Sequence, residues 1–245
     1  MISVSIVSHK QFNQVLNTIK SFELIEKNIF FYLITINVSE EYEEQKLKNL
    51  VGENFKLIIN NYPKGFGANH NFAFNYVKDE VFIICNPDIK VKKFNVNKFN
   101  IKFSDLSLYA PNVIDEKTGE LYFDIRDFPS LRNVLLRQIN KRLFKTIMKK
   151  NINEDLKYSW FPGYFMVISK DLFDQLKGFD EKYFMYCEDV DLCIRVKKIG
   201  YSLKKDNDIV VSHEGQFSSN NSLKYSIIHI KSIIRINFKR YLRIF

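Results

Sequence analysis

The fold is most easily read from positions 81–89, where the sequence is Val-Phe-Ile-Ile-Cys-Asn-Pro-Asp-Ile. The five apolar residues predict a buried strand, and Asn86-Pro87 predicts the turn that ends it. Upstream, apolar runs alternate with helix-like segments, and the predicted boundaries are 4–8, 12–22, 30–37, 40–50, 56–60 and 68–77. Strands that alternate with helices predict an α/β fold built from parallel β-α-β units.

Polar residues follow each of these predicted strands. They are Ser8-His9, Asn37, Asn60-Asn61 and Asn86-Pro87-Asp88. Taken singly, each is an ordinary turn. Together they indicate a binding edge, because ligands of parallel sheets gather outside the carboxyl ends of the strands. The chain has neither a G-x-G-x-x-G fingerprint nor a Walker lysine loop, which argues against a dinucleotide site and a P-loop triphosphate site.

The second half of the chain carries an unusual cluster of carboxylates. A hairpin is predicted over 108–125, a basic helix over 131–149, a strand over 158–168 interrupted by Pro162-Gly163, and a short helix over 170–177. Glu188, Asp189 and Asp191 then open an amphipathic helix. Clustered like charges repel, so such a group persists where cations, N–H donors or a substrate proton need it. With the distant Asp88, the cluster suggests a metal ion and a general base.

The net charge of +9 comes from two segments. Seven Lys/Arg lie between residues 132 and 150 and six more between 224 and 245, with no acidic residue in either segment. No helix-turn-helix, RRM or zinc-finger pattern accompanies them, so no nucleic-acid partner is expected. An anionic membrane surface fits the basic segments better.

The location follows from what the chain lacks. No export signal and no apolar run of roughly 18 residues is present, which predicts a cytoplasmic protein that binds peripherally to the inner face of the cell membrane. Three cysteines without metal-ligand spacing are expected to be reduced packing residues, namely Cys85, Cys187 and Cys193.

The C-terminal segment 221–245 predicts a basic amphipathic helix. Its apolar stripe is Ile227, Ile230, Ile234, Phe238, Tyr241 and Phe245, and Lys231, Arg235, Lys239 and Arg243 run alongside. Three uses of the stripe stay open: it packs on the domain, it forms a homo-oligomer, or it meets anionic lipid.

Ordered motifs along the chain resemble those of family 2 glycosyltransferases with the GT-A fold, in the bacterial rhamnosyltransferase-like branch. The matching segments are 65–71 (Gly-Phe-Gly-Ala-Asn-His-Asn), 86–89, 111–114 with Gly119, 126–130 (Arg-Asp-Phe-Pro-Ser), 161–166, 178–192 and 211–215. The resemblance runs from residue 2 to about 220. It implies a Rossmann-like, mostly parallel sheet flanked by helices. It also implies a GT-A domain over 1–220, with a nucleotide-sugar half at 1–110 and an acceptor half at 111–220, followed by the extension 221–245.

Individual residues inherit roles from this resemblance. Donor contacts are expected from Ser8, Asn37, Gly65, Asn69, Asn86 and Asp88, although strand 2 ends in Ile36-Asn37-Val38-Ser39 where relatives have Asp-Asn-x-Ser. Asp88 and His213 would hold Mn²⁺ or Mg²⁺, and Asp189 would be the general base. Glu188 and Asp191, three residues apart, share one helix face, which leaves Asp189 to face the cleft alone. Acceptor contacts are expected from Trp160, Gly163, Tyr164 and Glu188.

The predicted function is therefore an inverting, metal-dependent glycosyltransferase for bacterial surface polysaccharide. Its expected donor is dTDP-L-rhamnose, then a UDP-hexose, and its acceptor a saccharide or lipid-linked saccharide. Two alternatives come from other classes: a sugar-phosphate nucleotidyltransferase, which would need a basic Gly-rich loop near the first strand, and a catalytically silent nucleotide-sugar-binding protein. His9 and His70 stay open between packing and donor contact, and the aromatic residues of 179–186 between core packing and an acceptor platform.

Overall fold

The computed structural model describes residues 1–100, 107–116, 119–122, 128–129, 160–213 and 223–244. The predicted basic helix 131–149, the Arg126-Asp127 pair and the Glu214-Gly215 pair lie outside these residues. In the described part, nine strands form one sheet in the order β3-β2-β1-β4-β8-β6-β9-β5, with β7 paired to β6. The α/β fold is confirmed.

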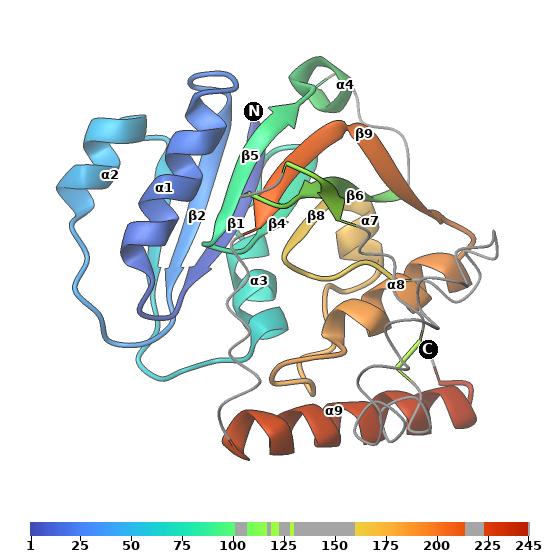
Figure 1. Cartoon of the computed structure of the whole chain (residues 1–245). Helices are drawn as coiled ribbons and strands as arrows, with labels where there is room; N and C mark the ends of the chain where they lie inside the picture. The colour runs from blue at the N-terminus through green and yellow to red at the C-terminus, as the bar shows by residue number, and fades with distance from the viewer. Residues whose placement is uncertain (101–106, 117–118, 123–127, 130–159, 214–222, 245) are drawn as a thin grey trace.

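The first half alternates strands and helices as predicted (Figure 1). Its elements are β1 (Ile2–Ser8), α1 (Phe12–Glu23), β2 (Phe30–Ile36), α2 (Glu44–Val51), β3 (Phe55–Ile59), α3 (Phe66–Phe74) and β4 (Val81–Cys85). The strands pair in parallel, with Ile6 of β1 opposite Ile34 of β2 and Cys85 of β4. Two helices begin elsewhere than predicted: α2 starts at residue 44 rather than 40, and α3 starts at residue 66, after the extended Gly65.

The second half mixes strand directions. It contains β5 (Ile89–Phe94), α4 (Val96–Asn100), β6 (Ser107–Ile114), β7 (Leu121–Tyr122), β8 (Phe165–Ser169), α7 (Lys170–Gln175), α8 (Glu188–Lys198), β9 (Ser202–His213) and α9 (Leu223–Tyr241). Strand β8 is antiparallel to β4 and β6, whereas β9 is parallel to β6 and antiparallel to β5. The predicted hairpin is present, since Val113 pairs with Tyr122. The sequence reading missed β5 and most of the twelve-residue β9.

Strand periodicity divides the core into two layers. In β4, Val81, Ile83 and Cys85 pack on one side with α1 and α2, while Phe82 and Ile84 pack on the other with α3, α7 and α8. Successive side chains of a strand point to opposite faces, which accounts for the split. The three cysteines are free thiols and buried, as predicted. Because helices cover both faces, ligands reach the sheet at its edges.

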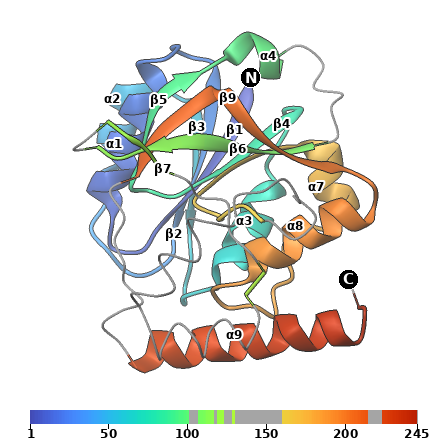
Figure 2. The same ribbon diagram turned by 45° about the vertical axis from the view of Figure 1, so that its right-hand side comes forward.

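The edge at the carboxyl ends of the parallel strands is the one nearest α9. In Figures 1 and 2, α9 lies below these strand ends, beyond α8 and the loop that precedes it. A third apolar cluster joins α9 to this loop: Ile233 and Ile236 pack with Tyr183, Cys187, Val190 and Phe128. The C-terminal helix is thus present as predicted, and it docks on α8 and the loop before it.

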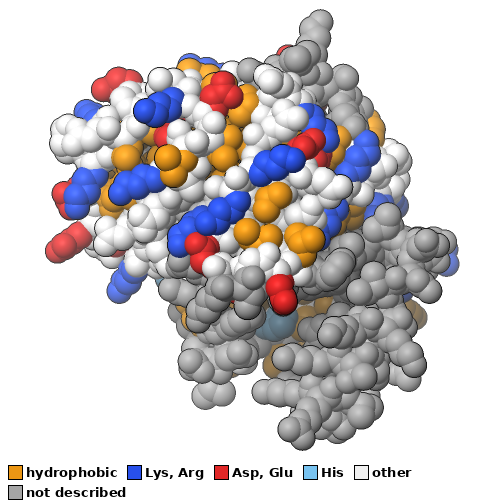
Figure 3. Space-filling view, turned by 45° about the horizontal axis from the view of Figure 1, so that its top comes forward, with side chains coloured by type: hydrophobic (Ala, Val, Ile, Leu, Met, Phe, Trp, Pro, Cys, Tyr) orange, Lys and Arg blue, Asp and Glu red, His pale blue; other side chains and the backbone are white. Residues whose placement is uncertain are grey.

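The opposite end of the molecule has a mixed surface. In Figure 3, Lys and Arg side chains alternate with acidic and apolar groups over the described part of that face. The charge pattern therefore does not mark this end as a site.

Candidate active site

The polar residues at the carboxyl ends of the first strands form a connected network. Asn37 Oδ1 accepts hydrogen bonds from the Lys64 backbone N–H (2.9 Å) and from Asn60 Nδ2 (2.9 Å), and Asn37 Nδ2 donates to Lys64 O (3.0 Å). Asn60 Nδ2 also donates to Asn69 Oδ1 (2.7 Å), and Asn69 Nδ2 donates to Gly65 O (3.0 Å). The network holds the turn at residues 64–65 against the sheet.

This network changes the interpretation of two predicted donor contacts. Asn37 and Asn69 are 6% and 1% exposed, and their amides serve the turn before α3. Contact of either side chain with a donor stays a prediction. Asn60, which links them, follows a predicted strand, but the sequence motifs assign it no role. Ser8 is fully buried, and its Oγ accepts from the Gln11 backbone N–H (3.1 Å) at the entry to α1.

Gly65 brings the turn against the loop that precedes α8. A Cβ atom at this position would lie 2.5 Å from the carbonyl oxygen of Phe184, closer than real Cβ atoms approach. The next residue, Phe66, donates its backbone N–H to the same oxygen at 2.9 Å. Only glycine permits this approach, because it has no side chain. The two halves of the predicted site therefore meet here.

His70 is part of the core beneath this turn. It is fully buried, its Nδ1 lies 2.8 Å from Ser5 Oγ, and its ring packs 4.5 Å from the ring of Phe66. Burial lowers the pKa of His70 to about 3, so the imidazole is neutral at physiological pH. The geometry favours packing for this residue.

Asp88 and His213 come together although 125 positions separate them. Strand β5 pairs with β9 so that Ile89 faces His213, and His213 Nε2 lies 3.1 Å from Asp88 Oδ2. Asp88 is 8% exposed, and its Oδ1 has no hydrogen-bond partner among the described residues. Helix α1 fixes this loop, because Thr18 Oγ1 lies 2.6 Å from Pro87 O.

This pair suits a divalent cation. A buried carboxylate oxygen without a partner and an imidazole nitrogen beside it are ligand types that Mn²⁺ accepts, and Mg²⁺ would use the carboxylate. The described residues hold no group of three His, Cys, Asp or Glu side chains that could bind a metal by themselves. The donor set fits an ion whose remaining ligands come from a substrate or from water.

Asp189 lies near the start of α8, where its carboxylate is fixed by two backbone groups. The Val190 N–H donates to Oδ1 (2.8 Å) and the Gly163 N–H donates to Oδ2 (3.0 Å). Asp189 is half-buried, whereas Glu188 is 5% and Asp191 0% exposed. Of the three clustered carboxylates, Asp189 is thus the one that reaches the surface.

The other two carboxylates have different surroundings. Burial and the neighbouring Asp189 raise the pKa of Glu188 well above its ordinary value, and its Oε2 has no hydrogen-bond partner among the described residues. Asp191 pairs with Arg195, four residues on, with Nε 2.7 Å from Oδ2, which is a favourable spacing for an ion pair on a helix. An acceptor contact by Glu188 stays a prediction, which its burial disfavours.

The segment Gly163-Tyr164 lies between Asp189 and the Asp88–His213 pair. Gly163 touches Asp189, and the ring of Tyr164 packs against that of His213 with centroids 4.7 Å apart. The Tyr164 carbonyl also accepts from the Asn86 backbone N–H (2.8 Å). Adjacent Cα atoms are only about 3.8 Å apart, so Asp189 and the Asp88–His213 pair flank one short segment. Tyr164 therefore lies beside the predicted metal ligands, while Trp160 is partly buried between two apolar clusters.

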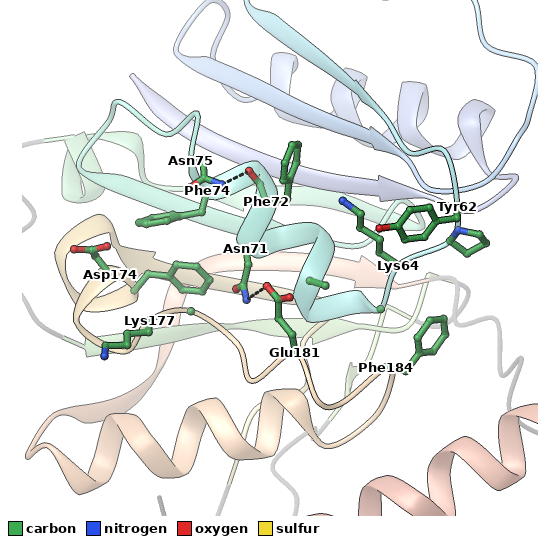
Figure 4. Close-up of a pocket in the computed structure, with 15 residues that line it drawn as sticks. Tyr62, Lys64, Asn71, Phe72, Phe74, Asn75, Asp174, Lys177, Glu181 and Phe184 are labelled. Atoms are coloured by element: carbon green, nitrogen blue, oxygen red, sulfur yellow. Dashed lines mark hydrogen bonds between the residues drawn. The ribbon is translucent and has the colours of Figure 1, made fainter.

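A pocket of about 670 Å³ lies on the outer side of α3 (Figure 4). Tyr62, Lys64 and Phe72 line one end, and Lys64 Nζ lies 4.6 Å from the centroid of the Phe72 ring. Asn71 Nδ2 donates to Glu181 Oε1 (3.0 Å) within it. The pocket adjoins the site through Gly65 and Phe184 but includes neither Asp88 nor Asp189.

Comparison with known proteins identifies the relationship. No family model matches the chain. Over 153 residues it is 35% identical to rhamnosyltransferase WbbL of Escherichia coli, covering 57% of this chain and 56% of that protein. Over 165 residues it is 35% identical to N-acetylglucosaminyl-diphospho-decaprenol L-rhamnosyltransferase of Mycobacterium tuberculosis, covering 63% and 53%. The chain is a relative of rhamnosyltransferases. It spans just over half the length of each of these two proteins.

The structural comparison confirms the GT-A fold. A crystal structure of GalNAc-T7 with UDP, GalNAc and Mn²⁺ superposes with a TM-score of 0.62 at 15% identity, covering 90% of this chain and 45% of that one. At that identity the likeness concerns the fold alone. The resemblance to rhamnosyltransferases is confirmed by the two sequence relatives, and the individual site residues rest on the geometry above.

Proposed function

We propose that this rhamnosyltransferase relative is an inverting glycosyltransferase that moves a sugar from a nucleoside diphosphate sugar to a saccharide or lipid-linked saccharide in surface polysaccharide synthesis. One observation carries the proposal: the Asp88–His213 pair and Asp189 flank the segment Gly163-Tyr164. Sugar transfer needs charge neutralisation at the leaving diphosphate and proton removal from the acceptor. These two groups of side chains have the chemistry for the two tasks.

In this proposal, Asp88 and His213 hold Mn²⁺ or Mg²⁺. The bound ion supplies Lewis-acid stabilisation of the departing diphosphate. The chain's own part is orientation. Strands β5 and β9 fix the two ligands, the ring of Tyr164 packs on His213, and the backbone of Asn86 is tied to Tyr164. Asn37, Gly65 and Asn69 would shape the donor edge through the turn at residues 64–65, and Ser8 through the entry to α1.

Asp189 accepts the acceptor's proton in this mechanism. Its two backbone donors set the direction of the carboxylate. Glu188 stays beside it as a buried carboxyl group with a raised pKa. A pair of neighbouring carboxyls with such different surroundings is the arrangement by which acids and bases are separated in active sites.

The donor is expected to be dTDP-L-rhamnose, followed by UDP-hexoses, including a galactofuranose donor. Similarity to two rhamnosyltransferases supports this order. A thermal-shift screen of nucleotide sugars with Mn²⁺ tests it, because a ligand at 100 times its Kd stabilises by about 2.7 kcal/mol. Hydrolysis and transfer assays follow for each hit. A clear preference for a GDP-sugar would contradict the assignment.

The acceptor is proposed to lie at the membrane, with the protein bound peripherally to its cytoplasmic face. None of the helices in the described ranges is long and apolar enough to cross a bilayer. On α9, however, Ile227, Ile230, Ile234, Phe238 and Tyr241 are 49–84% exposed, and this set is named the outer stripe. Exposed basic neighbours include Lys231 and Arg243. Apolar side chains flanked by cations suit an anionic lipid surface.

The structure corrects the charge pattern assumed for this helix. Arg235 and Lys239 do not border a free surface, because they pair with carboxylates of the acceptor half. The outer stripe is also not the face through which α9 packs on the domain. The division into residues 1–110, 111–220 and 221–245 remains our proposal for the domains, with α9 docked on the second part.

Liposome binding tests the outer stripe with point variants. We expect wild-type protein to co-sediment with anionic but not neutral vesicles and to be released by about 0.5 M salt, where charges are strongly screened. Ile230→Glu combined with Ile234→Glu should abolish sedimentation, and Leu24→Glu, at an 85% exposed position directly after α1, is the control. If the double variant sediments like wild type, the lipid contact lies elsewhere. If wild type does not sediment and forms dimers that the double variant loses, the stripe is an oligomer interface.

A further inference from the structure

The inner side of α9 contacts the loop that leads to Asp189. We call Ser232, Ile233, Arg235, Ile236 and Lys239 the docking face. Ile233 and Ile236 are 2% and 0% exposed and pack with Tyr183, Cys187 and Val190. Ser232 Oγ donates a hydrogen bond to the Met185 carbonyl at 2.8 Å. The helix therefore covers residues 183–190, the direct approach to the predicted base.

Two cations of the docking face neutralise two carboxylates of the acceptor half. Arg235 Nη2 lies 2.8 Å from Asp180 Oδ2, and Lys239 Nζ lies 3.2 Å from the same oxygen while also pairing with Asp191 Oδ1. Burial alone would raise the pKa of Asp180. Hydrogen bonds from Arg235, the Lys182 backbone and Lys239 outweigh this effect and lower the pKa to about 2. Asp191 is completely buried, and its ion-pair partners are Arg195 and Lys239.

The backbone under this helix is strained. Tyr186 and Cys187, the two residues directly before α8, have φ values of 71° and 65°. Non-glycine residues rarely adopt positive φ, and two in succession persist only where the surrounding structure holds them. The holding contacts come from α9: Ser232 on Met185, the His229 ring 4.7 Å from that of Tyr186, and the Ile233–Ile236 cluster on Cys187.

We propose that Lys239 is a positioning residue, which fixes the first turn of α8, and with it Asp189, by bridging Asp180 and Asp191. This inference rests on the proposed function, in which Asp189 is the base. Asp180 lies before the strained turn and Asp191 lies after it, so one ammonium group ties the two ends of the turn together. The C-terminal helix then completes the acceptor half and leaves the Asp88–His213 pair untouched.

The test compares Lys239→Met, which keeps the side-chain stem and removes the charge, with Lys27→Met, an exposed position between α1 and β2. Lys239→Met should lower kcat for transfer by about 10–100-fold, since a small misplacement of a catalytic group has effects of that size. Its donor KM and its affinity for nucleoside diphosphate with Mn²⁺ should stay within twofold of wild type. Lys239→Arg should restore most of the transfer rate, and Lys27→Met should behave as wild type.

Trp160 supplies a second readout. It is the only tryptophan of the chain and packs against the cluster that contains Ile233 and Ile236. We expect the fluorescence emission of Lys239→Met to shift, with that of Lys27→Met unchanged. Wild-type kcat and emission in Lys239→Met would overturn the positioning role. So would an equal loss of transfer and donor affinity, which would show a general loss of folded protein. Failure of the proposed function looks different, because wild type itself would then transfer no sugar.

Discussion

The Asp88–His213 pair and Asp189 are held in place in different ways. Asp88 and His213 lie at the paired ends of β5 and β9, a direct product of strand register. Asp189 follows a strained two-residue turn whose shape depends on contacts from α9. A site on paired strands depends on few other elements, whereas a site on a supported turn is sensitive to every element that supports it. Changes on the donor side and on the acceptor side should therefore have separable effects.

The largest effect should come from Asp189→Asn, which removes the proton acceptor and nearly preserves the shape. A general base typically contributes about 10²–10⁴-fold, and the rate of transfer should fall by that factor. Donor affinity, measured by calorimetry with Mn²⁺, should be unchanged because Asp88 and His213 are intact. Asp171→Asn, on the exposed side of α7, is the matched control. Turnover within threefold of wild type would show that the general base is another residue. Asp189 and the Asp88–His213 pair would then not have the separate roles proposed here.

The converse experiment alters the metal pair. Asp88→Ala and His213→Ala should each weaken Mn²⁺-dependent binding of nucleoside diphosphate by at least the roughly 10–100-fold that loss of a second-shell partner produces. Calorimetry with and without Mn²⁺ separates this loss from metal-independent binding. Undiminished affinity in His213→Ala would leave Asp88 as the metal ligand and make the His213–Tyr164 stack structural.

The smallest effect concerns Glu188, whose pKa is raised in the folded protein. When the pKa of a carboxyl group is higher in the folded than in the unfolded protein, the group stabilises the folded protein fully at pH values below its unfolded-state pKa. This stabilisation is lost as the pH rises towards the folded-state pKa. Glu188→Gln should thus match wild type near pH 4 and exceed its Tm near pH 8. A gain of about 2–4 °C would correspond to about 1 kcal/mol. Glu53→Gln, at an exposed loop position, should show no such trend. A variant less stable at both pH values would argue against a buried, protonated Glu188.

The sequence predicts local structure well and long-range contacts poorly. A run of five apolar residues places β4 at its observed boundaries, and motif resemblance brings Asp88 and His213 to one site although periodicity could not. The Gly163–Asp189 contact depends on how β8 and α8 pack, and the sequence of neither segment predicts it. The same holds for Lys239, whose partners lie 59 and 48 positions away.

The C-terminal helix shows this limit most clearly. A helical wheel finds the outer stripe but cannot say which face meets the protein. The residues that dock are Ile233 and Ile236, beside that stripe, and they are chosen by complementarity with Tyr183 and Cys187. Two of the four cations expected to face lipid are drawn inward by Asp180 and Asp191 instead.

The dependence of the acceptor loop on α9 also sets an order of assembly. The four parallel strands β1 to β4 are contiguous with their helices in the chain, so the donor half can form while later residues are still being synthesised. We expect the turn at Tyr186-Cys187 to reach its final shape only after α9 has left the ribosome. Its supporting contacts come from far along the chain, since Ser232 lies 47 residues after Met185. Until α9 has been synthesised, Tyr183 and its apolar neighbours should be exposed to solvent. Nascent chains stopped before residue 223 should therefore present a surface that chaperones recognise, and completion of the helix is the step that withdraws it.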